Sequence, residues 1–440
     1  MDIDNSPIGH LPPEILEVIF RLFIASFSPL AEIDAIFLLS RVCPRWHAIC
    51  NSTPLLWTQP YFHRSKSPSL NSEIISTILS RSDGLPVSVI IDMISRPEHA
   101  PEAVLEYQPL LDVQDRLENL VLAVQRGDVV PHAPDMPKFP LLASLDITMT
   151  DDCEEPSELL ALGEIFLSSC PSLRTFSLTV QNTLLPARIP NLPLHQLTSL
   201  TLVTPIQDMA LYDMLIQCSL LEDLHVEEVE ETGEVRTRPV HIMPALRSLD
   251  YTTAADCLGD ILERLRFPLL DSLALSSAQP EHALLWDPVP IILELHEDSP
   301  FQLLHLAMSG LDTIPEELVV LLRCVTPTLE TLVLDDMPHV LPVFAAPFGL
   351  TLPRLTTLEI SGCSDEVDGA ELVQLVDSLL AHRGESNGAF PTLHSVQLKL
   401  DGALFDEAVE EHLARVEADS NGFFRALGER VEEEEEEEIY

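Results

Sequence analysis

Pro327-Thr-Leu-Glu-Thr-Leu-Val-Leu334 is the stretch that decides the fold, because close copies of it recur along the chain. Its last two leucines sit two positions apart, so in an extended strand they point to the same face. One unit has nothing to bury that apolar face against, and neighbouring units must therefore stack. Five further strong copies span Pro171–Leu178, Pro244–Tyr251, Pro268–Leu275, Pro353–Ile360 and Pro391–Leu398.

The spacing of the copies predicts a repeat architecture. Most copies, counting weaker ones such as Leu117/Leu120/Leu122, lie about 24 to 33 residues apart, which is typical of leucine-rich solenoids. The proline that opens each strong copy separates a helix from the strand that follows it. The expected fold is therefore α/β, with an irregular leucine-rich-repeat-like solenoid over residues 86–400. Strands would line its concave side and helices its convex side. Such a stack presents an extended surface for binding another macromolecule.

The repeats are degenerate. They lack the Asn or Cys that satisfies the turn in regular repeats, so the turns must be closed in other ways. The long gaps at residues 276–300 and 362–390 are expected to project as loops. A Ser or Thr just before the second of the motif's three leucines is expected to face solvent in eight copies: Ser144, Thr175, Ser199, Ser248, Ser272, Thr331, Thr357 and Ser395.

The charge balance argues against a nucleic-acid binder and against an anionic-membrane binder, because both need basic patches. The chain has 440 residues, a net charge of −47 and a pI near 4.4. Residues 1–66 are nearly neutral, with six acids and five bases. The N-terminal segment and the rest of the chain are therefore expected to meet different partners. Neither a secretory signal nor a membrane span is recognised.

Little in the sequence points to catalysis. The eight cysteines show no Cys-x-x-Cys arrangement and are interpreted as buried, reduced thiols of a cytoplasmic or nuclear protein. No glycine-rich phosphate loop or His-Glu-x-x-His motif occurs, and the histidines show no ligand spacing. Cys43 and Cys50 with His47 are expected to pack on an apolar helix, and the Asp335-Asp336 pair is expected to end a strand. We therefore expect no enzyme activity, no cofactor and no metal.

The N-terminal block predicts three short helices. Leu11-Pro-Pro-Glu-Ile-Leu-Glu-Val-Ile-Phe-Arg-Leu-Phe23 places apolar residues at helical spacing, with prolines suited to the first turn. A second apolar run over residues 33–43 is followed by Pro44, which restarts the helix before Trp46. Pro54-Leu-Leu-Trp57 closes the block.

This block resembles an F-box. The resemblance rests on Leu11-Pro12, Glu14-Ile15-Leu16, Ile19-Phe20, Val42-Cys43, Trp46 and Pro54-Leu55-Leu56-Trp57. The whole chain looks like fungal F-box proteins in which this module precedes irregular leucine-rich repeats. One departure is that the stretch from Phe23 to Ile36 is longer than the usual connector, so the path of the second helix is open.

The resemblance implies docking on the Skp-type adaptor of cullin–RING ubiquitin ligases. The residues that would carry this contact are Leu11, Pro12, Ile15, Leu16, Ile19 and Phe20, with Val42 and Trp46 either sharing in it or holding the helices together. A unit this small cannot bury all its apolar residues and would gain from a partner. The alternative interpretation is that the block only caps the N-terminal end of the solenoid.

The resulting domain prediction has five parts: an F-box-like helical domain at 1–60, a connector at 61–85, the solenoid at 86–400, a capping helix at 401–431 and an acidic tail at 432–440. The expected function is that of a non-catalytic substrate receptor. A scaffold without a ligase role is the alternative, and a binder of basic nuclear proteins through the Glu432–Glu438 run is a third possibility. Substrate contacts are expected at polar positions between strand leucines: Asp146, Ser177, Thr201, His225, Asp250, Glu359 and Gln397.

Overall fold

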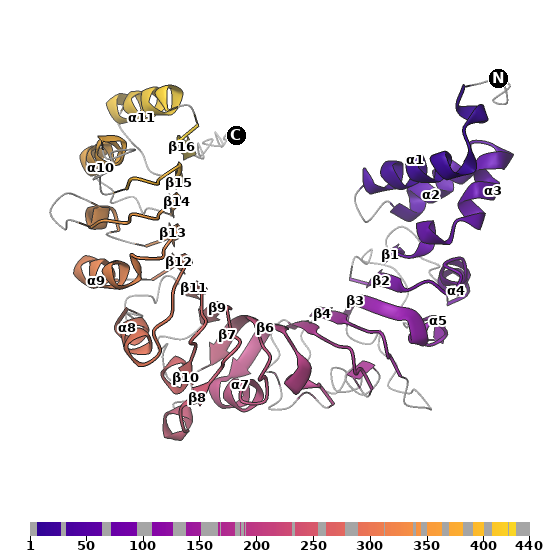
Figure 1. The fold of residues 1–440 in the computed structure, drawn as a ribbon, viewed down its shortest axis with the longest axis horizontal. Helices are drawn as coiled ribbons and strands as arrows, with labels where there is room; N and C mark the ends of the chain where they lie inside the picture. The colour runs from indigo at the N-terminus through magenta and orange to yellow at the C-terminus, as the bar shows by residue number, and fades with distance from the viewer. Residues whose placement is uncertain are drawn as a thin grey trace, which may run out of the picture. The chain divides into compact units, whose positions relative to one another are not determined.

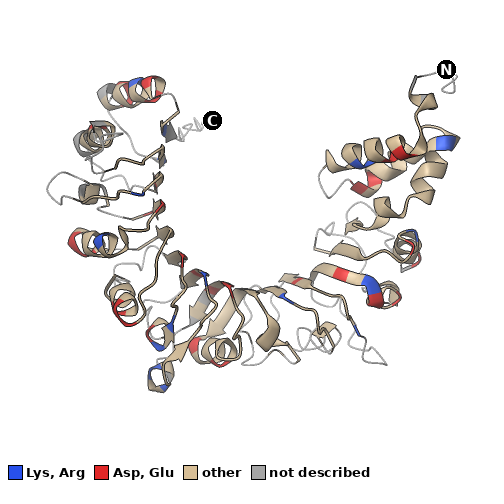
Figure 2. Cartoon of the chain, in the orientation of Figure 1, with Lys and Arg blue, Asp and Glu red and all other residues tan. Residues whose placement is uncertain are grey.

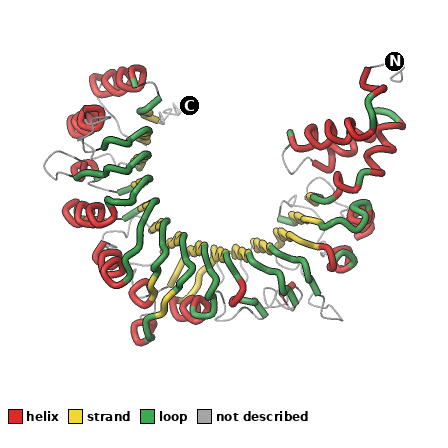
Figure 3. The backbone as a smooth tube through the Cα atoms, in the orientation of Figure 1, coloured by secondary structure: helices red, strands yellow, loops and turns green. Residues whose placement is uncertain are grey.

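The computed structural model describes residues 7–27, 32–63, 72–94, 108–125, 138–150, 166–167, 169–180, 185, 189, 191–230, 234–253, 261–277, 289–311, 313–337, 340–344, 350–362, 369–381, 390–399, 407–420 and 422–427. The chain forms two compact units, residues 1–205 and residues 206–440. In each unit, short parallel strands alternate with loops and helices (Figure 3).

Unit 1 begins with a short 3₁₀ turn and a group of three helices. They are α1 (Pro13–Ala25), α2 (Glu32–Ser40) and α3 (Pro44–Ser52), followed by the 3₁₀ turn η4 (Pro54–Trp57). Pro13 and Pro44 each open a helix, where a missing N–H costs little. Cys43 caps α3 by accepting the backbone N–H of Trp46 on its sulfur, at 3.5 Å.

The rest of unit 1 is a parallel sheet. Its strands lie side by side in chain order: β1 (Tyr61–His63), β2 (Val87–Asp92), β3 (Leu117–Gln125), β4 (Ser144–Thr150), β5 (Thr175–Val180) and β6 (Ser199–Gln207). Helices α4 (Ser72–Ser80) and α5 (Gln108–Leu111) lie on one side of it (Figure 1). The segment predicted as a connector, residues 61–85, therefore contains the first strand and the helix α4.

Unit 2 repeats the same arrangement. Its strands are β7 (Asp223–Glu230), β9 (Ser248–Thr253), β11 (Ser272–Ser277), β12 (His305–Ser309), β13 (Thr331–Asp335), β14 (Thr357–Ser361), β15 (Ser395–Lys399) and β16 (Phe424–Leu427). A separate parallel pair joins β8 (His241–Ile242) to β10 (Leu265–Arg266). Its helices are α7 (Asp208–Leu215), α8 (Val289–Asp298), α9 (Pro315–Val325), α10 (Gly369–Ala381) and α11 (Glu407–Asp419), and α8 to α11 flank one side of the strands (Figure 1).

The strand leucines build the core through their register. Leu306, Leu332 and Leu358 are direct partners on neighbouring strands, and all three are buried. Alternate residues point to the other face, because strand side chains alternate. All eight of the predicted Ser/Thr positions open a strand and are half-buried, as expected for that second face.

The turns that lack the usual Asn or Cys are closed by shared carbonyl groups. In most repeats, two successive backbone amides donate to one carbonyl of the preceding repeat. Thus Glu330 and Thr331 both donate to the carbonyl of Leu304, and Thr356 and Thr357 both donate to that of Glu330.

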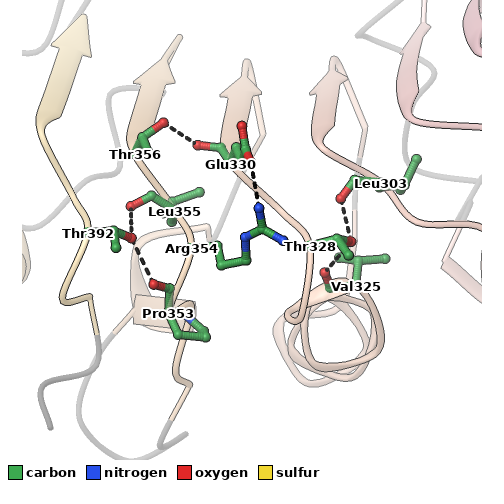
Figure 4. A network of polar contacts seen from close by, with 9 residues as sticks. All are labelled: Leu303, Val325, Thr328, Glu330, Pro353, Arg354, Leu355, Thr356 and Thr392. Carbon is green, nitrogen blue, oxygen red and sulfur yellow. Dashed lines mark hydrogen bonds and ion pairs between the residues drawn. The ribbon is translucent and has the colours of Figure 1, made fainter. Parts of the chain in front are cut away.

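Threonine hydroxyls add a second closure to these turns (Figure 4). Thr328 donates to the carbonyl of Leu303 at 2.7 Å, and Thr392 donates to that of Pro353 at 2.8 Å. Ser172 makes the equivalent bond to the carbonyl of Pro140 at 2.6 Å. The hydroxyl after the leading proline of the motif therefore ties one repeat to the previous one.

Replacing Thr328 by valine keeps the shape of this side chain and removes its hydroxyl. We expect the free energy of unfolding to fall by about 1–2 kcal/mol, because the carbonyl of Leu303 loses a hydrogen bond. Urea denaturation followed by circular dichroism measures the change. Thr331→Val is the control, since Thr331 is half-exposed at the start of β13 and has no described side-chain hydrogen bond. Equal losses in the two variants would contradict this role for Thr328.

The open edge of β16, the last described strand of unit 2, has backbone groups that are satisfied by a side chain. The hydroxyl of Ser420 accepts the backbone N–H of Phe424 at 3.1 Å and donates to the carbonyl of the same residue at 3.3 Å. Because the ladder to β15 uses the neighbouring backbone groups, Ser420 satisfies the groups of β16 that point away from β15. Helix α11 buries Val409, Leu413 and Val416 beside this strand.

Two sequence predictions need correction. The gaps at 276–300 and 362–390 contain helices α8 and α10 rather than only loops, because apolar residues at helical spacing bury one face of each helix. Of the described cysteines, Cys50, Cys170 and Cys218 are buried, whereas Cys43 is half-buried and Cys324 is exposed on α9.

The Glu432–Glu438 tail lies outside the described residues, as do the ends of the predicted capping segment 401–431. Among the helices that the structure describes, none has the length and apolar character needed to cross a bilayer.

Candidate functional site: an exposed apolar surface on the N-terminal helices

Helix α1 is apolar on two faces. Leu16, Phe20 and Ile24 recur every four residues and are buried against the other helices. On the far side, Ile15, Val18 and Leu22 are 47%, 51% and 68% exposed. A surface helix normally carries one apolar stripe, which it buries against its own protein. The second stripe of α1 is instead left exposed by the described residues. We call Ile15, Val18, Leu22 and Phe23, together with Leu55 of η4, the exposed apolar surface.

The buried face of α1 keeps the three helices together. The rings of Phe20 and Trp46 lie with centroids 4.8 Å apart, so Trp46 of α3 packs over α1. The Arg45 guanidinium donates to the backbone carbonyl of Leu11, which fixes the start of α1 against α3. These contacts fix α1, which carries most of the exposed apolar surface, against α3.

A cleft of about 610 Å³ opens beside this surface. Val18, Leu22 and Leu55 supply its apolar lining, and Arg21 and Glu32 add one charge of each sign. Burial raises the pKa of the Glu32 carboxyl group. The cleft therefore combines an apolar lining with two charged side chains, Arg21 and Glu32.

The structure divides the predicted adaptor-contact residues into three groups. Pro12, Ile15 and Val42 are exposed, and Leu11, Ile19 and Trp46 are half-buried. Leu16 and Phe20 are completely buried. Leu16 and Phe20 therefore support the packing of the helices and are not accessible to a partner.

Sequence reasoning missed the most exposed residues of this surface. Val18 and Leu22 were not singled out, because they lie outside the motif positions, and Leu55 belongs to the motif but was not predicted as an adaptor contact. The signal that could have found them is the total apolar count of α1, which exceeds what one buried stripe can hold.

The second candidate surface is the sheet face opposite the helices. In unit 1, Asp146 and Ser177 are direct partners on β4 and β5, and Thr201 continues the same row on β6. Burial raises the pKa of the Asp146 carboxyl group, and a hydrogen bond with Ser177 partly offsets this. Three of the predicted substrate contacts therefore form one row.

Unit 2 places the other four predicted contacts in two pairs on the corresponding row. His225 faces Asp250, and Glu359 faces Gln397. The Nδ1 atom of His225 lies 2.8 Å from the Asp250 carboxylate and its Nε2 atom lies 3.1 Å from Glu227. The hydrogen bond to Asp250 raises the pKa of His225, against a smaller lowering by burial. Ala274, Ala307 and Val333 occupy the row between the two pairs.

No cluster of three or more His, Cys, Asp or Glu side chains able to hold a metal ion occurs among the described residues. Burial raises the pKa of Cys50 to about 11 and that of Cys170 and Cys218 to about 12, so these thiols stay protonated. Asp335 ends β13 as expected, and its carboxylate accepts hydrogen bonds from Ser309 and Ser361 on the neighbouring strands.

Comparison with protein families identifies the N-terminal helices. Residues 8–63 match the F-box-like family model, so this part of the chain is an F-box-like domain. A search of curated proteins gave no match. An F-box-like domain suggests a role in ubiquitin ligase complexes as a substrate adaptor, and such domains generally bind Skp-type adaptors. Beyond this domain, the structure is a mixed α/β arrangement rich in parallel strands.

Proposed function

We propose that the chain is a non-catalytic substrate receptor of a Skp–cullin–F-box ubiquitin ligase. Its F-box-like domain docks on the Skp-type adaptor and through it joins a cullin, and its sheet holds a protein substrate. Ubiquitin transfer then gains from proximity, because the receptor brings the substrate to the transfer machinery and supplies no reacting group.

The observation that carries this proposal is the exposed apolar surface within the matched residues. Leu22 alone is 68% exposed on a regular helix, and Val18 and Leu55 line the cleft beside it. Full burial of such a side chain from water is worth about 1.5–3 kcal/mol, and these three keep about half or more of their surface exposed. A partner that covers them gains the corresponding part of this free energy.

The distal part of the chain is, in this proposal, an irregular leucine-rich-repeat-like solenoid. The constant register of its strand leucines and the shared carbonyl closures support this interpretation. The proposed substrate contacts are the sheet row with Asp146 in unit 1 and the sheet row with His225, Asp250 and Glu359 in unit 2. Since these side chains are polar and mostly acidic, the substrate surface that fits is basic or rich in hydroxyl groups.

A matched pair of variants tests the docking step. Leu22→Asp places a charge in the centre of the exposed apolar surface, and we expect capture by the purified Skp-type adaptor to fall by about tenfold or more. The fold should survive, because Leu22 packs little within its own chain. Capture is measured in a pull-down with the full-length chain.

Leu269→Asp is the control for that experiment. Leu269 is 49% exposed in unit 2, so the same chemical change occurs far from α1 in the sequence. We expect this variant to bind the adaptor as the unchanged chain does. If Leu22→Asp and Leu269→Asp were captured equally well, the docking proposal would be wrong.

A further inference from the structure

The basic residues of this chain are almost all arginines. Only three of the 24 basic residues are lysines, namely Lys66, Lys138 and Lys399, and the other 21 are arginines. Basic residues occur on helices and turns of both units and on strands of unit 2 (Figure 2), so cationic side chains are tolerated in each kind of element of the described fold. Lysine is ordinarily one of the commonest residues in globular proteins. Its scarcity here therefore requires an explanation other than a lack of positions for a cation.

Local contacts explain some of the arginines. The Arg116 guanidinium donates to the hydroxyl of Ser82 and to the carbonyls of Leu85 and Leu79. Arg266 similarly donates to the carbonyls of Glu263 and Leu265. A guanidinium offers five donors in a planar fork, and an ammonium group cannot reproduce these combinations.

Other arginines make contacts that lysine would make equally well. Arg247 lies 3.5 Å from Asp271 and is 56% exposed, and Arg354 lies 3.1 Å from Glu330 and is 55% exposed. Each of these is a single ion pair at the surface, which contributes little to stability with either cation. Packing and charge therefore do not account for arginine at these two positions.

The difference between the two cations is chemical. In ubiquitin transfer, the neutral amine of a lysine attacks the thioester that joins ubiquitin to a conjugating enzyme. A C–N bond forms, the C–S bond breaks, the enzyme's cysteine leaves as a thiolate and the amine gives up a proton. Arginine stays protonated in proteins and does not take this role.

We propose that the chain is depleted of lysine so that the ligase does not attach ubiquitin to its own receptor. This inference rests on the proposed function, since only a protein held beside the transfer machinery gains from such depletion. The two described lysines differ as acceptors. Lys138 is exposed, whereas the Nζ atom of Lys399 is bound to the Glu359 carboxylate and must leave it before it can attack. Lys138 is therefore the residual modification site among the described residues.

The test restores lysines without changing charge. The full-length chain, assembled with the Skp-type adaptor, a cullin–RING ligase, a conjugating enzyme and ubiquitin, is compared with the double variant Arg247→Lys, Arg354→Lys. We expect self-modification of the double variant to be about twofold faster or more, because two exposed acceptors are added. We also expect mass spectrometry of the unchanged chain to find more ubiquitin on Lys138 than on Lys399.

Three controls make the outcome decisive. Arg247→Gln with Arg354→Gln loses the same cations without adding acceptors and should show no gain. A variant with Lys66, Lys138 and Lys399 all changed to arginine sets the background. A lysine-bearing peptide fused to the C-terminus reports whether the ligase transfers ubiquitin at all.

Each result has one meaning. If the fused peptide is modified but the double lysine variant gains nothing, the depletion proposal is overturned while the ligase function stands. Preferential modification of Lys399 would overturn the ranking of the two lysines. If even the fused peptide stays unmodified, the proposed function itself fails, and the inference fails with it.

Discussion

Replacing Trp57 by alanine is expected to destabilise unit 1 by about 3–5 kcal/mol, the largest loss among the substitutions considered for this chain. Trp57 is 1% exposed and ends the 3₁₀ turn η4 within the F-box-like domain. Its indole N–H donates to the carbonyl of Cys50 at 2.8 Å, and its ring lies 6.0 Å from that of Phe37. The substitution removes both contacts and leaves a cavity.

The same ring also contacts the residue after α4, and the backbone that follows Trp57 pairs with the sheet. The Arg81 guanidinium, one residue beyond α4, lies 4.5 Å from the centre of the Trp57 ring. Just after Trp57, the carbonyls of Thr58 and Pro60 accept the backbone N–H groups of Ser88 and Ile90. Trp57→Ala should therefore loosen the helices and the first strands together, which hydrogen exchange of residues 44–63 and 87–92 would detect.

Trp57→Phe is the matched control, since it keeps a large ring and removes the N–H donor. We expect it to cost clearly less than Trp57→Ala, because most of the packing is retained. Urea denaturation gives both free energies of unfolding. Similar stability of Trp57→Ala and the unchanged chain would show that the ring does not hold this junction.

Gly362→Ala is expected to cost about 2–4 kcal/mol, for two reasons that add. Gly362 has a φ of +63°, which an alanine adopts only with strain. A Cβ atom at this position would also lie 2.6 Å from the backbone nitrogen of Asp336, and this backbone is held by its hydrogen bond to the carbonyl of Ser361. The turn after β14 cannot move away without breaking that bond.

Gly84→Ala separates the two reasons. Gly84 has a φ of +79°, but nothing lies within 4 Å of the position its Cβ would take. We expect this variant to lose only the conformational part, about 1–2 kcal/mol. Equal losses for Gly84→Ala and Gly362→Ala in thermal unfolding would show that the close approach to Asp336 plays no part.

The repeat motif predicted the strands well because its chemistry is local. Two leucines two positions apart define a buried strand face wherever they occur, and the Ser/Thr before the first of them opened a strand in all eight copies that carry it. The strand β1 was missed, since Tyr61-Phe62-His63 is too short to show a pattern and is fixed by its partner β2.

The exposed residues of the candidate site were harder to predict from the sequence, because burial depends on packing between helices. Leu16 and Phe20 match the family motif as well as Ile15 does, but only Ile15 remains exposed once α1 packs against α3. The row of polar sheet positions was easier, because strand alternation alone sets which side chains share a face. The structure adds their pairing, such as His225 with Asp250.

The central claim is that the exposed apolar surface of α1 docks a Skp-type adaptor. Calorimetric titration of the full-length chain with the purified adaptor, at several temperatures, tests it most directly. We expect one adaptor per chain, a negative heat-capacity change from apolar burial, and loss of the binding heat in Leu22→Asp. Absence of binding heat with the unchanged chain, or full binding by Leu22→Asp, would contradict it.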